Sequence, residues 1–457
     1  MKKIISLAVI ASFLTTTTMP IIAIENTQAD YKQIHTEKVD ITKNKYDHIN
    51  LSWWQNFKDP ILVEYIIKAI ENNKDLKLAS LTIDEFYQNV VSTRSVQMPS
   101  INAGFLPGYS DIGNGASDSY AFPIFASWEL DIYGKNRNKV NSARKLWESS
   151  ILDERAAYIS IASAVGSTYV NIVKLDAQID LQEDIVKLRK EIFDMMEISN
   201  KEGLISTSDL VKANQAYVIG VTNLTDMKKN RSKLLHQLAV LIGDSPENIE
   251  EYKRIDYKNL VFEGFIPEKV PSEVIMQRPD YLKAEKMLEK AGIDVKIARK
   301  ECLPAINLGG LVLFNAQNIG SLFTTSNAFW GLGGGLLHPI FAGGRIKANL
   351  KLKKIAYEKS LKNYEKVNLI SMQEVNDTLV SINMDKEKLT KQEEVQNLEK
   401  KDFDLTKLKY MEGIIAKLDL NQKEENLLNV NKMVYASKFD CMIDYISFYK
   451  AIGAKNI

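Results

Sequence analysis

The stretch KNRNKVNSARKLWESSILDERAAYISIASAVGSTYVNIVKLDAQIDLQEDIVKLRKEIFDMMEISNKE, residues 135–202, decides the fold of this 457-residue chain. It lies between Gly134 and Gly203, contains no proline, and has Gly166 as its only internal glycine. Because proline and glycine cost most inside a helix, the stretch predicts one helix of roughly 100 Å. A second stretch of the same length, between Gly344 and Gly413, has neither proline nor internal glycine. Two equal helices of this length are typical of a duplicated, extended protein rather than of a compact enzyme.

A nearly constant shift in residue number relates the two halves of the chain. The matching pairs are Arg94 with Arg299 and Pro99 with Pro304 at a shift of 205, and Gly203 with Gly413 and Asp209 with Asp419 at a shift of 210. Such internal repetition predicts two copies of one structural unit. Each copy is expected to contain a helix, two β segments, a long helix, a tight turn and a returning helix.

The hydrophobic period changes from 3.6 to 2 after Pro99. Residues 120–132 alternate between apolar side chains, including Trp128, and the polar side chains of Ser127, Glu129 and Asp131. This pattern is typical of a membrane strand with one face in lipid and one facing a watery lumen, although it also fits a half-buried strand of a soluble sheet. We expect a polar loop from Pro107 to Ser119.

The second half repeats this β pattern. A strand is expected after Pro304, then a polar loop at 315–327, then a strand in which Trp330 and other apolar residues alternate with glycines. The glycine cluster at 331–335 lacks the Lys-Ser/Thr and the following helix of a phosphate-binding loop, so we interpret it as strand. Four strands do not close a barrel. Three copies of the chain would supply twelve, and two or four copies fit the same reasoning.

Composition excludes several classes of protein. The chain has 59 Lys and Arg against 58 Asp and Glu, which is not the basic footprint of a nucleic-acid binder. Its two cysteines allow at most one bridge, and its four histidines are scattered, so no metal or other cofactor is predicted. Residues 1–29, with Lys2, Lys3 and a short apolar core, predict a cleaved signal peptide, with a retained anchor as the alternative.

Five motifs give the chain a family resemblance. They are WWQNFKDP at 53–60, WELDIYG at 128–134, QRPD at 277–280, PIFAGGR at 339–345 and YMEG at 410–413. With them the chain resembles the TolC-like outer membrane factors, of the multidrug and nodulation-type efflux subgroup. The resemblance implies a mainly α fold with membrane β-structure: a homotrimeric α-barrel of long helical hairpins in the periplasm, and a shared twelve-stranded β-barrel in outer membrane lipid, four strands per chain. It also implies a periplasmic adaptor protein and an inner-membrane pump as partners.

The expected domain limits follow the repeat. They are a signal peptide at 1–29, a first repeat at 30–243 with strands at about 99–132 and a hairpin at about 134–243, an equatorial linker at 244–275, a second repeat at 276–430 with strands at about 304–340 and a hairpin at about 344–430, and a C-terminal equatorial segment at 431–457.

The resemblance places functional residues at the hairpin turns. It assigns a periplasmic gate to Asp419, Gln422 and Asp209, and an adaptor contact to the tip turns at Gly203, Leu204, Gly413 and Ile414. Each aspartate could instead simply cap the start of a returning helix. The phase of the first strand predicts Glu129 and Asp131 in the barrel lumen, with Trp128 and Trp330 facing the membrane.

The predicted function is a passive outer-membrane exit duct of a tripartite efflux or type I secretion system, opened at its periplasmic tip by adaptor and pump. A secreted coiled-coil scaffold or surface adhesin without transport activity is the alternative. The alternating segments at 120–132 and 329–337 argue against it. No catalytic constellation is found, so no enzyme activity is predicted.

Overall fold

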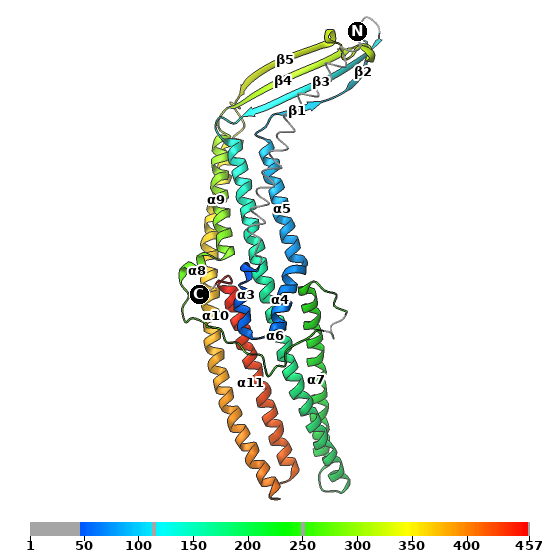
Figure 1. The fold of residues 1–457 in the computed structure, drawn as a ribbon, viewed down its shortest axis with the longest axis vertical. Coiled ribbons are helices and arrows are strands. Elements are labelled where there is room, and N and C mark those ends of the chain that lie inside the picture. The colour runs from blue at the N-terminus through cyan, green and yellow to red at the C-terminus, as the bar shows by residue number, and fades with distance from the viewer. Residues whose placement is uncertain (1–45, 112–115, 248–251, 456–457) are drawn as a thin grey trace. The chain divides into compact units, whose positions relative to one another are not determined.

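The computed structural model describes residues 46–111, 116–247 and 252–455, so the predicted signal peptide lies outside the described residues. The chain is mainly helical and carries one antiparallel sheet (Figure 1). It divides into two compact units. The first holds Leu81–Leu152 and Leu282–Lys366, and the second holds Lys45–Ser80, Asp153–Tyr281 and Val367–Ile457. Each unit therefore combines parts of both sequence repeats.

The duplication is visible in the helix lengths. Helices α6 (Lys135–Lys201) and α10 (Arg345–Met411) both have 67 residues. Helices α5 (Lys74–Ser95) and α9 (Pro279–Lys300) both have 22. The returning helices α7 (Thr207–Ile242) and α11 (Lys417–Ala451) have 36 and 35. Because α11 runs unbroken to Ala451, most of the segment expected at 431–457 is the second half of this helix.

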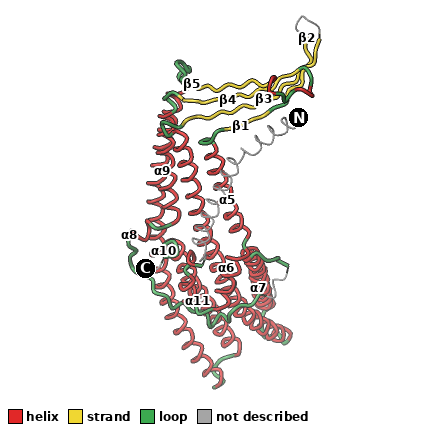
Figure 2. The backbone as a smooth tube through the Cα atoms, turned by 45° about the horizontal axis from the view of Figure 1, so that its top comes forward, coloured by secondary structure: helices red, strands yellow, loops and turns green. Residues whose placement is uncertain are grey.

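The first unit contains the sheet. Its strands are β1 (Ser100–Ala103), β2 (Leu106–Asp111), β3 (Ala116–Leu130), β4 (Ala305–Ala316) and β5 (Ala328–Leu337). The order is β1-β3-β4-β5, with β2 pairing with β3 on the same side as β1, so the sheet is four strands wide (Figure 2). Two short 3-10 helices, η4 (Ile319–Ser321) and η5 (Thr325–Asn327), lie in the β4–β5 connection.

The predicted loop from Pro107 to Ser119 is wrong. Residues 106–111 form β2 and pair with residues 116–121 of β3. Proline and glycine at 107 and 108 suggested a break, but the pairing with β3 keeps them in the ladder. The actual break falls at Gly104 and Phe105. Gly104 donates its N–H to the carbonyl of Pro123, and Pro123 has no N–H with which to complete the pair.

The strand registers divide the sheet into two chemically different faces. Trp128 lies opposite Leu308, which lies opposite Gly334, and Ile124 lies opposite Val312, which lies opposite Trp330. Since side chains alternate along a strand, these residues share one face, and their neighbours on it are almost all apolar. The other face, which we call the polar face, carries Ser100, Asn102, Ser127, Glu129 and Asn307 together with Gly309, Gly331, Gly333 and Gly335. Phe125, Leu311, Leu313 and Phe329 also lie on it, further along the strands from Glu129.

The second unit is built on a core beside the middle of the long helices. Short segments η1 (Asp47–Ile49), α3 (Leu51–Trp54) and η2 (Gln55–Phe57) lead into α4 (Pro60–Asn72), and α8 (Ser272–Met276) precedes α9. Trp54, Tyr169 and Tyr449 are fully buried here. Asp59 caps α4, because its Oδ1 accepts the N–H of Ile61 at 2.8 Å and Pro60 supplies the first turn.

Candidate functional site

Both hairpin turns are closed by a glycine with a positive φ angle. Gly203 has φ +73° and Gly413 has φ +74°, in the left-handed region that favours glycine. The next residue, Leu204 or Ile414, donates its N–H to the carbonyl of Ser199 or Lys409 at 2.9 Å in each case. This is the bonding of a Schellman motif, which ends a helix and satisfies its last carbonyls. It leaves the side chains of Leu204 and Ile414 exposed at the turns.

The two predicted gate aspartates occupy matching positions in the first turns of the returning helices. Asp209 accepts a hydrogen bond from the Ser206 hydroxyl at 2.8 Å and pairs with Lys212 at 3.2 Å. These contacts, the hydroxyl first, lower the pKa of Asp209. Asp419 accepts the backbone N–H of Ala416 at 3.2 Å. Both carboxylates therefore bind groups at a helix start, yet Asp419 is exposed and Asp209 is half-exposed.

Gln422 lies one turn beyond Asp419 on α11 and is also exposed, whereas Leu420 and Asn421 between them are buried. Asp419 and Gln422 therefore share the open face of α11. Asp209 begins the other returning helix. The gate role of these three residues stays a prediction at this point.

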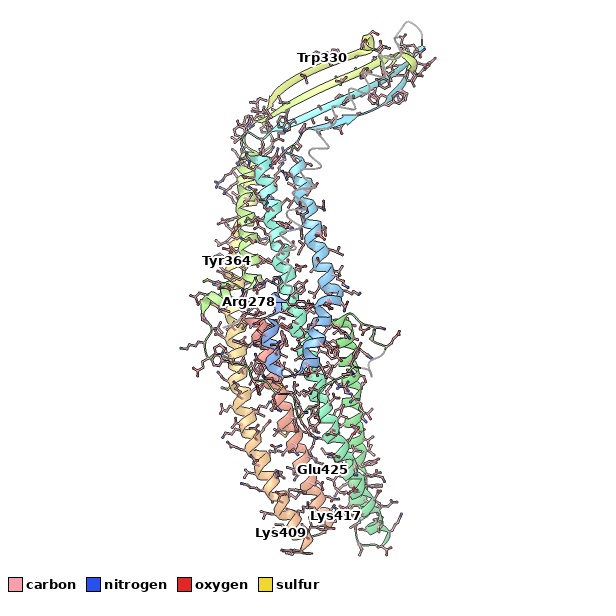
Figure 3. The ribbon with its side chains drawn as sticks, viewed as in Figure 1. Arg278, Trp330, Tyr364, Lys409, Lys417 and Glu425 are labelled. Atoms are coloured by element: carbon pink, nitrogen blue, oxygen red, sulfur yellow. The ribbon has the colours of Figure 1, made fainter. Side chains whose placement is uncertain are left out.

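Ion pairs join the two hairpins within one chain, and sequence reasoning missed them. Arg189 of α6 binds Glu425 of α11 at 2.6 Å and also donates to the Ala216 carbonyl of α7 at 2.8 Å. Further from the turns, Lys174 of α6 binds Asp440 of α11 at 2.6 Å. Helices α6 and α11 are thus neighbours (Figure 3 labels Glu425). No local sequence motif predicts contacts between residues more than 200 positions apart.

The predicted sheet residues differ in their surroundings. Glu129 lies on the polar face and pairs with Lys135 at 2.5 Å. Asp131 follows the end of β3, and its carboxylate accepts the N–H groups of Asn136 and Arg137 at 2.9 and 2.7 Å. Asp131 therefore satisfies free N–H groups at the start of α6. The strand phase that placed it in the lumen does not extend to its position, because β3 ends at Leu130.

The two tryptophans lie on the apolar face of the sheet. Trp128 donates its Nε1–H to the Gln97 carbonyl at 2.9 Å, so its polar atom is satisfied. Trp330 is well exposed in the single chain (Figure 3). An apolar face of this kind needs a non-aqueous neighbour.

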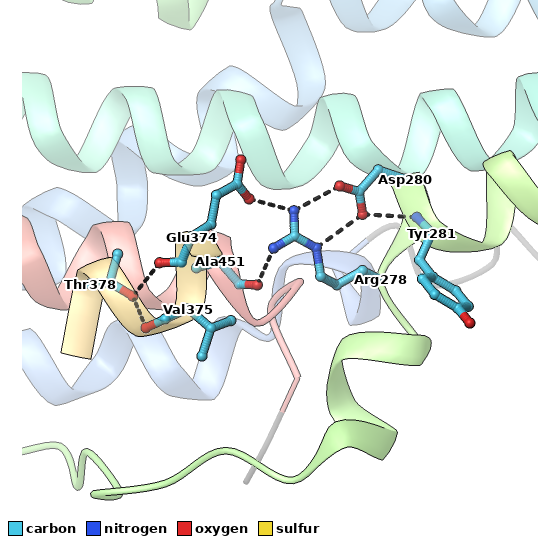
Figure 4. A network of polar contacts seen from close by, with 7 residues as sticks. All are labelled: Arg278, Asp280, Tyr281, Glu374, Val375, Thr378 and Ala451. Atoms are coloured by element: carbon cyan, nitrogen blue, oxygen red, sulfur yellow. Dashed lines mark hydrogen bonds and ion pairs between the residues drawn. The ribbon is translucent and has the colours of Figure 1, made fainter. Parts of the chain in front are cut away.

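Arg278, from the QRPD motif, ties three separate segments together (Figure 4). The residue is only 6% exposed. It binds Asp280 through two nitrogens at 3.0 and 2.7 Å, Glu374 of α10 at 2.6 Å and the Ala451 carbonyl of α11 at 2.7 Å. Burial lowers the pKa of Arg278, but the bonds to the two carboxylates outweigh it and the net shift is upward. The motif contains Arg278 and its partner Asp280, but it gave no sign of the partners on α10 and α11.

The described residues include no cluster of His, Cys, Asp or Glu suited to a metal ion. Both cysteines, Cys302 and Cys441, are free. Within the same described ranges, one helix, α6, has an apolar window long enough to cross a membrane, but 61% of that window is buried inside the fold. We therefore assign this window to the protein core.

Comparisons to known proteins agree with the fold. The family model described as "Outer membrane efflux protein" matches residues 65–244 and 270–454. Curated relatives include the probable efflux pump outer membrane protein TtgC of Pseudomonas putida, 25% identical over 411 residues that cover 88% of this chain and 84% of TtgC. Another is the cation efflux system protein CusC of Escherichia coli, 25% identical over 412 residues that cover 88% of both chains.

Solved structures share the fold. The CmeC outer membrane channel of Campylobacter jejuni superposes with a TM-score of 0.81 at 23% identity, covering 89% of this chain and 88% of CmeC. A CusC structure gives 0.77 at 22% identity, covering 88% and 94%. This chain belongs to the outer membrane efflux protein family. It is an outer membrane efflux channel rather than an enzyme or a secreted coiled-coil scaffold.

Proposed function

We propose that three copies of this chain assemble into one exit duct, with a twelve-stranded barrel in the outer membrane and a closed wall of helices in the periplasm. The sheet carries the proposal. It is four strands wide, apolar on one face, and its edge strands β1/β2 and β5 have no further strand partner among the described residues. Open edges cost several kcal/mol per unpaired group in lipid, so copies must join edge to edge. Twelve strands fall within the range of outer-membrane barrels.

The helices support the same assembly. In α10 the in-chain packing row includes Ile382, Leu389 and Gln396, spaced by seven residues; Ile382 is buried and the other two are partly buried. Leu398 and Leu405 have the same spacing on another side of the helix and are 65% and 59% exposed. Two packing rows on different sides of one helix are typical of a helix with a neighbour on each side. Helix α7 likewise exposes Val211, Val218 and Ile219, and we assign these two open rows to the contact between adjacent copies.

The assembly is tested by its mass. Purified protein in detergent should run as a heat-sensitive oligomer and have the mass of three chains by light scattering. The variant Leu398→Asp/Leu405→Asp should shift it toward the monomer, because charge enters a proposed interface. The control Asn397→Asp adds a charge at a neighbouring exposed position and should not. A dimer, a tetramer or an unaffected double variant contradicts the arrangement.

The lumen follows from the sheet faces. With the apolar face toward lipid, the face of Glu129, Ser127, Asn307 and the strand glycines lines the pore. Around Ser127 and Glu129 the small side chains and glycines of this face leave room for solutes, whereas Phe125 and Phe329 lie on it further along the strands. Trp128 and Trp330 contact the membrane. This choice is supported by the cost of a charge in lipid, about 2–4 kcal/mol at mid-bilayer.

The gate in our proposal is at the hairpin turns. A threefold axis would bring three Asp419 side chains together, and Gln422 one turn further would add a neutral ring. The caps at Asp419 and Asp209 do not conflict with this role, because neither carboxylate is buried and each retains lone pairs for a cation. The exposed Leu204 and Ile414 offer apolar contacts to a periplasmic adaptor, and an inner-membrane pump would deliver substrate through it. Opening must loosen the hairpins, so the Arg189–Glu425 pair resists it.

Single-channel recording in planar bilayers tests the gate. Asp419→Asn should reduce cation selectivity and block by divalent cations, and Asp209→Asn should do so less. Arg189→Gln should raise the open probability and leave selectivity unchanged. If Asp419→Asn leaves both selectivity and block unchanged, Asp419 is a helix-start residue only and the constriction lies elsewhere.

A further inference from the structure

The turns that join the sheet to the long helices expose apolar side chains. Between β5 and α10, Ile340 is 99% and Phe341 is 88% exposed. Between β3 and α6, Ile132 and Tyr133 are also exposed. All four lie in the same unit as the sheet. Side chains of this size at such exposure mark a surface that contacts something other than water.

Basic side chains lie on the first turns of the helices that follow, α10 and α6. Residues 345–366 hold eight Lys or Arg and two Glu, in a chain whose overall balance is only +1. Lys347, Lys351 and Lys354 follow one another by four and three residues, so they form one row on α10, and all three are exposed. The surplus charge is therefore concentrated at one end of the long helix.

The first repeat preserves two of the three positions of this row, since Lys351 corresponds to Asn141. Arg137 and Arg144 of α6 stand 210 positions before Lys347 and Lys354, and both are exposed. In the part of the chain that the structure describes, the ion pairs near these rows use other residues, such as Lys135 with Glu129 and Lys362 with Glu365. Repetition of the same charge on the same helical face in both repeats favours a shared ligand.

The row on α6 faces away from the polar side of the sheet. Lys135 reaches Glu129, which lies on that polar face. Arg137 is two residues and Arg144 nine residues beyond Lys135. At 3.6 residues per turn these separations place both arginines about 160–180° around the helix from Lys135. The row therefore lies on the side of α6 that corresponds to the apolar face of the sheet.

We propose that the two turns and the two basic rows form a belt that binds the phosphate groups of anionic phospholipids at the periplasmic surface of the outer membrane. The inference rests on the proposed insertion of the sheet into that membrane. Ile340, Phe341 and Ile132 enter the edge of the hydrocarbon, and the rows meet the headgroups. From Lys347 to Lys354 the helix rises about 10 Å, comparable to the headgroup layer of about 5–8 Å.

The probe is a lipid of defined charge. The full-length channel is reconstituted in phosphatidylcholine, and spin-labelled phosphatidylglycerol is compared with spin-labelled phosphatidylcholine by electron paramagnetic resonance. Since each basic residue near a membrane surface contributes to binding anionic lipid, we expect at least about a threefold preference for phosphatidylglycerol. This preference ratio should fall toward one in 1 M salt, where the Debye length is about 3 Å.

A combined variant identifies the residues. Replacing Arg137, Arg144, Lys347, Lys351 and Lys354 by Gln should abolish the preference. Replacing the three lysines by Arg should retain it. A matched control, Lys400→Gln/Lys401→Gln/Lys407→Gln, removes three exposed lysines from the other end of α10 and should have no effect.

Recording channel currents from the same reconstituted protein distinguishes failure of the proposed duct from failure of the proposed lipid belt. If the wild-type protein forms no channel, the proposed function fails. If it forms channels but does not prefer phosphatidylglycerol, or if the five-residue variant keeps that preference, the lipid belt is wrong while the duct stands. If the variant changes ion selectivity and not lipid preference, the rows line the lumen, which also overturns the belt.

Discussion

Gly166 offers a test in which two physical effects have opposite signs. It is the only glycine inside α6, where alanine would be favoured by about 1 kcal/mol. The structure gives the reason for glycine. A Cβ at this position would lie 2.6 Å from Cη2 of Trp54 and 3.3 Å from Cδ1 of Ile446. Trp54 is fully buried in the core and cannot turn aside.

The balance of the two effects predicts destabilisation by Gly166→Ala. Forcing one extra carbon into a packed core costs typically about 1–3 kcal/mol, and sometimes more. A contact of 2.6 Å against a rigid indole belongs at the upper end of that range. After the gain of about 1 kcal/mol in helix propensity, we expect a net loss of about 1–2 kcal/mol.

Gly292 is the matched control. It lies inside α9, and its nearest neighbour is Tyr357, 3.6 Å from the added Cβ, an ordinary contact. Gly292→Ala should therefore be neutral or stabilise by up to about 1 kcal/mol. The assay is the unfolding temperature followed by tryptophan fluorescence and by loss of the oligomer band. At about 2–4 °C per kcal/mol, the two variants should shift in opposite directions or differ by several degrees.

A second substitution checks the cause. Trp54→Leu alone should destabilise the protein, but it should remove most of the additional cost of Gly166→Ala, because the clashing ring is gone. The steric explanation is refuted if Gly166→Ala is as stable as the wild type. It is also refuted if Gly166→Ala costs as much in the Trp54→Leu background as it does in the wild-type chain.

Three further predictions concern the contacts of Arg278, the turn at Gly413 and the lumen face of the sheet. Arg278→Ala leaves two half-exposed carboxylates without their counter-charge, and we expect a loss of about 2–3 kcal/mol in thermal denaturation, below the range for a fully buried pair. Gly413→Val forces a β-branched residue to positive φ, and amide hydrogen exchange at that turn should accelerate about tenfold, as about 1–2 kcal/mol of strain implies. Ser127→Cys should react with a membrane-impermeant maleimide, and Ala126→Cys, on the other sheet face, should not.

Each of these has a control. Arg278→Lys keeps the charge but not the forked geometry, so wild-type stability in Arg278→Lys would contradict a role for the bonds that the guanidinium makes to several partners. Unchanged exchange in Gly413→Val would show that the turn has no need of glycine. The labelling uses Cys302→Ser as background, since Cys302 is exposed. Equal labelling at 126 and 127 would show that the assignment of the faces is wrong.

The ends of the long helices could be predicted because glycine decides them locally. Gly134, Gly203, Gly344 and Gly413 all have positive φ angles, a conformation that other residues avoid. Asp59 and Pro60 likewise determine the start of α4 through cap chemistry. Where one or two adjacent residues set the backbone, the sequence suffices.

Features set by distant residues could not be predicted. Strand β2 contains proline and glycine and exists because β3 pairs with it. Two of the three partners of Arg278, Glu374 and Ala451, are 96 and 173 positions away. The end of β3 at Leu130 was missed for a different reason. Alternation continues through Asp131 in the sequence, while the carboxylate of Asp131 binds the start of α6.

The equal lengths of α6 and α10 restrict how this protein can evolve. Both hairpins end at the same end of their unit (Figure 1), and each long helix spans 67 residues. Deleting about seven residues from one copy would shorten that helix by about 10 Å, leaving the two turns at different levels. Deletions that keep the two hairpin turns at the same level must therefore occur in both long helices together and in multiples of the helical repeat. A gene for a shorter or longer duct should differ from this one by paired changes, about 210 codons apart.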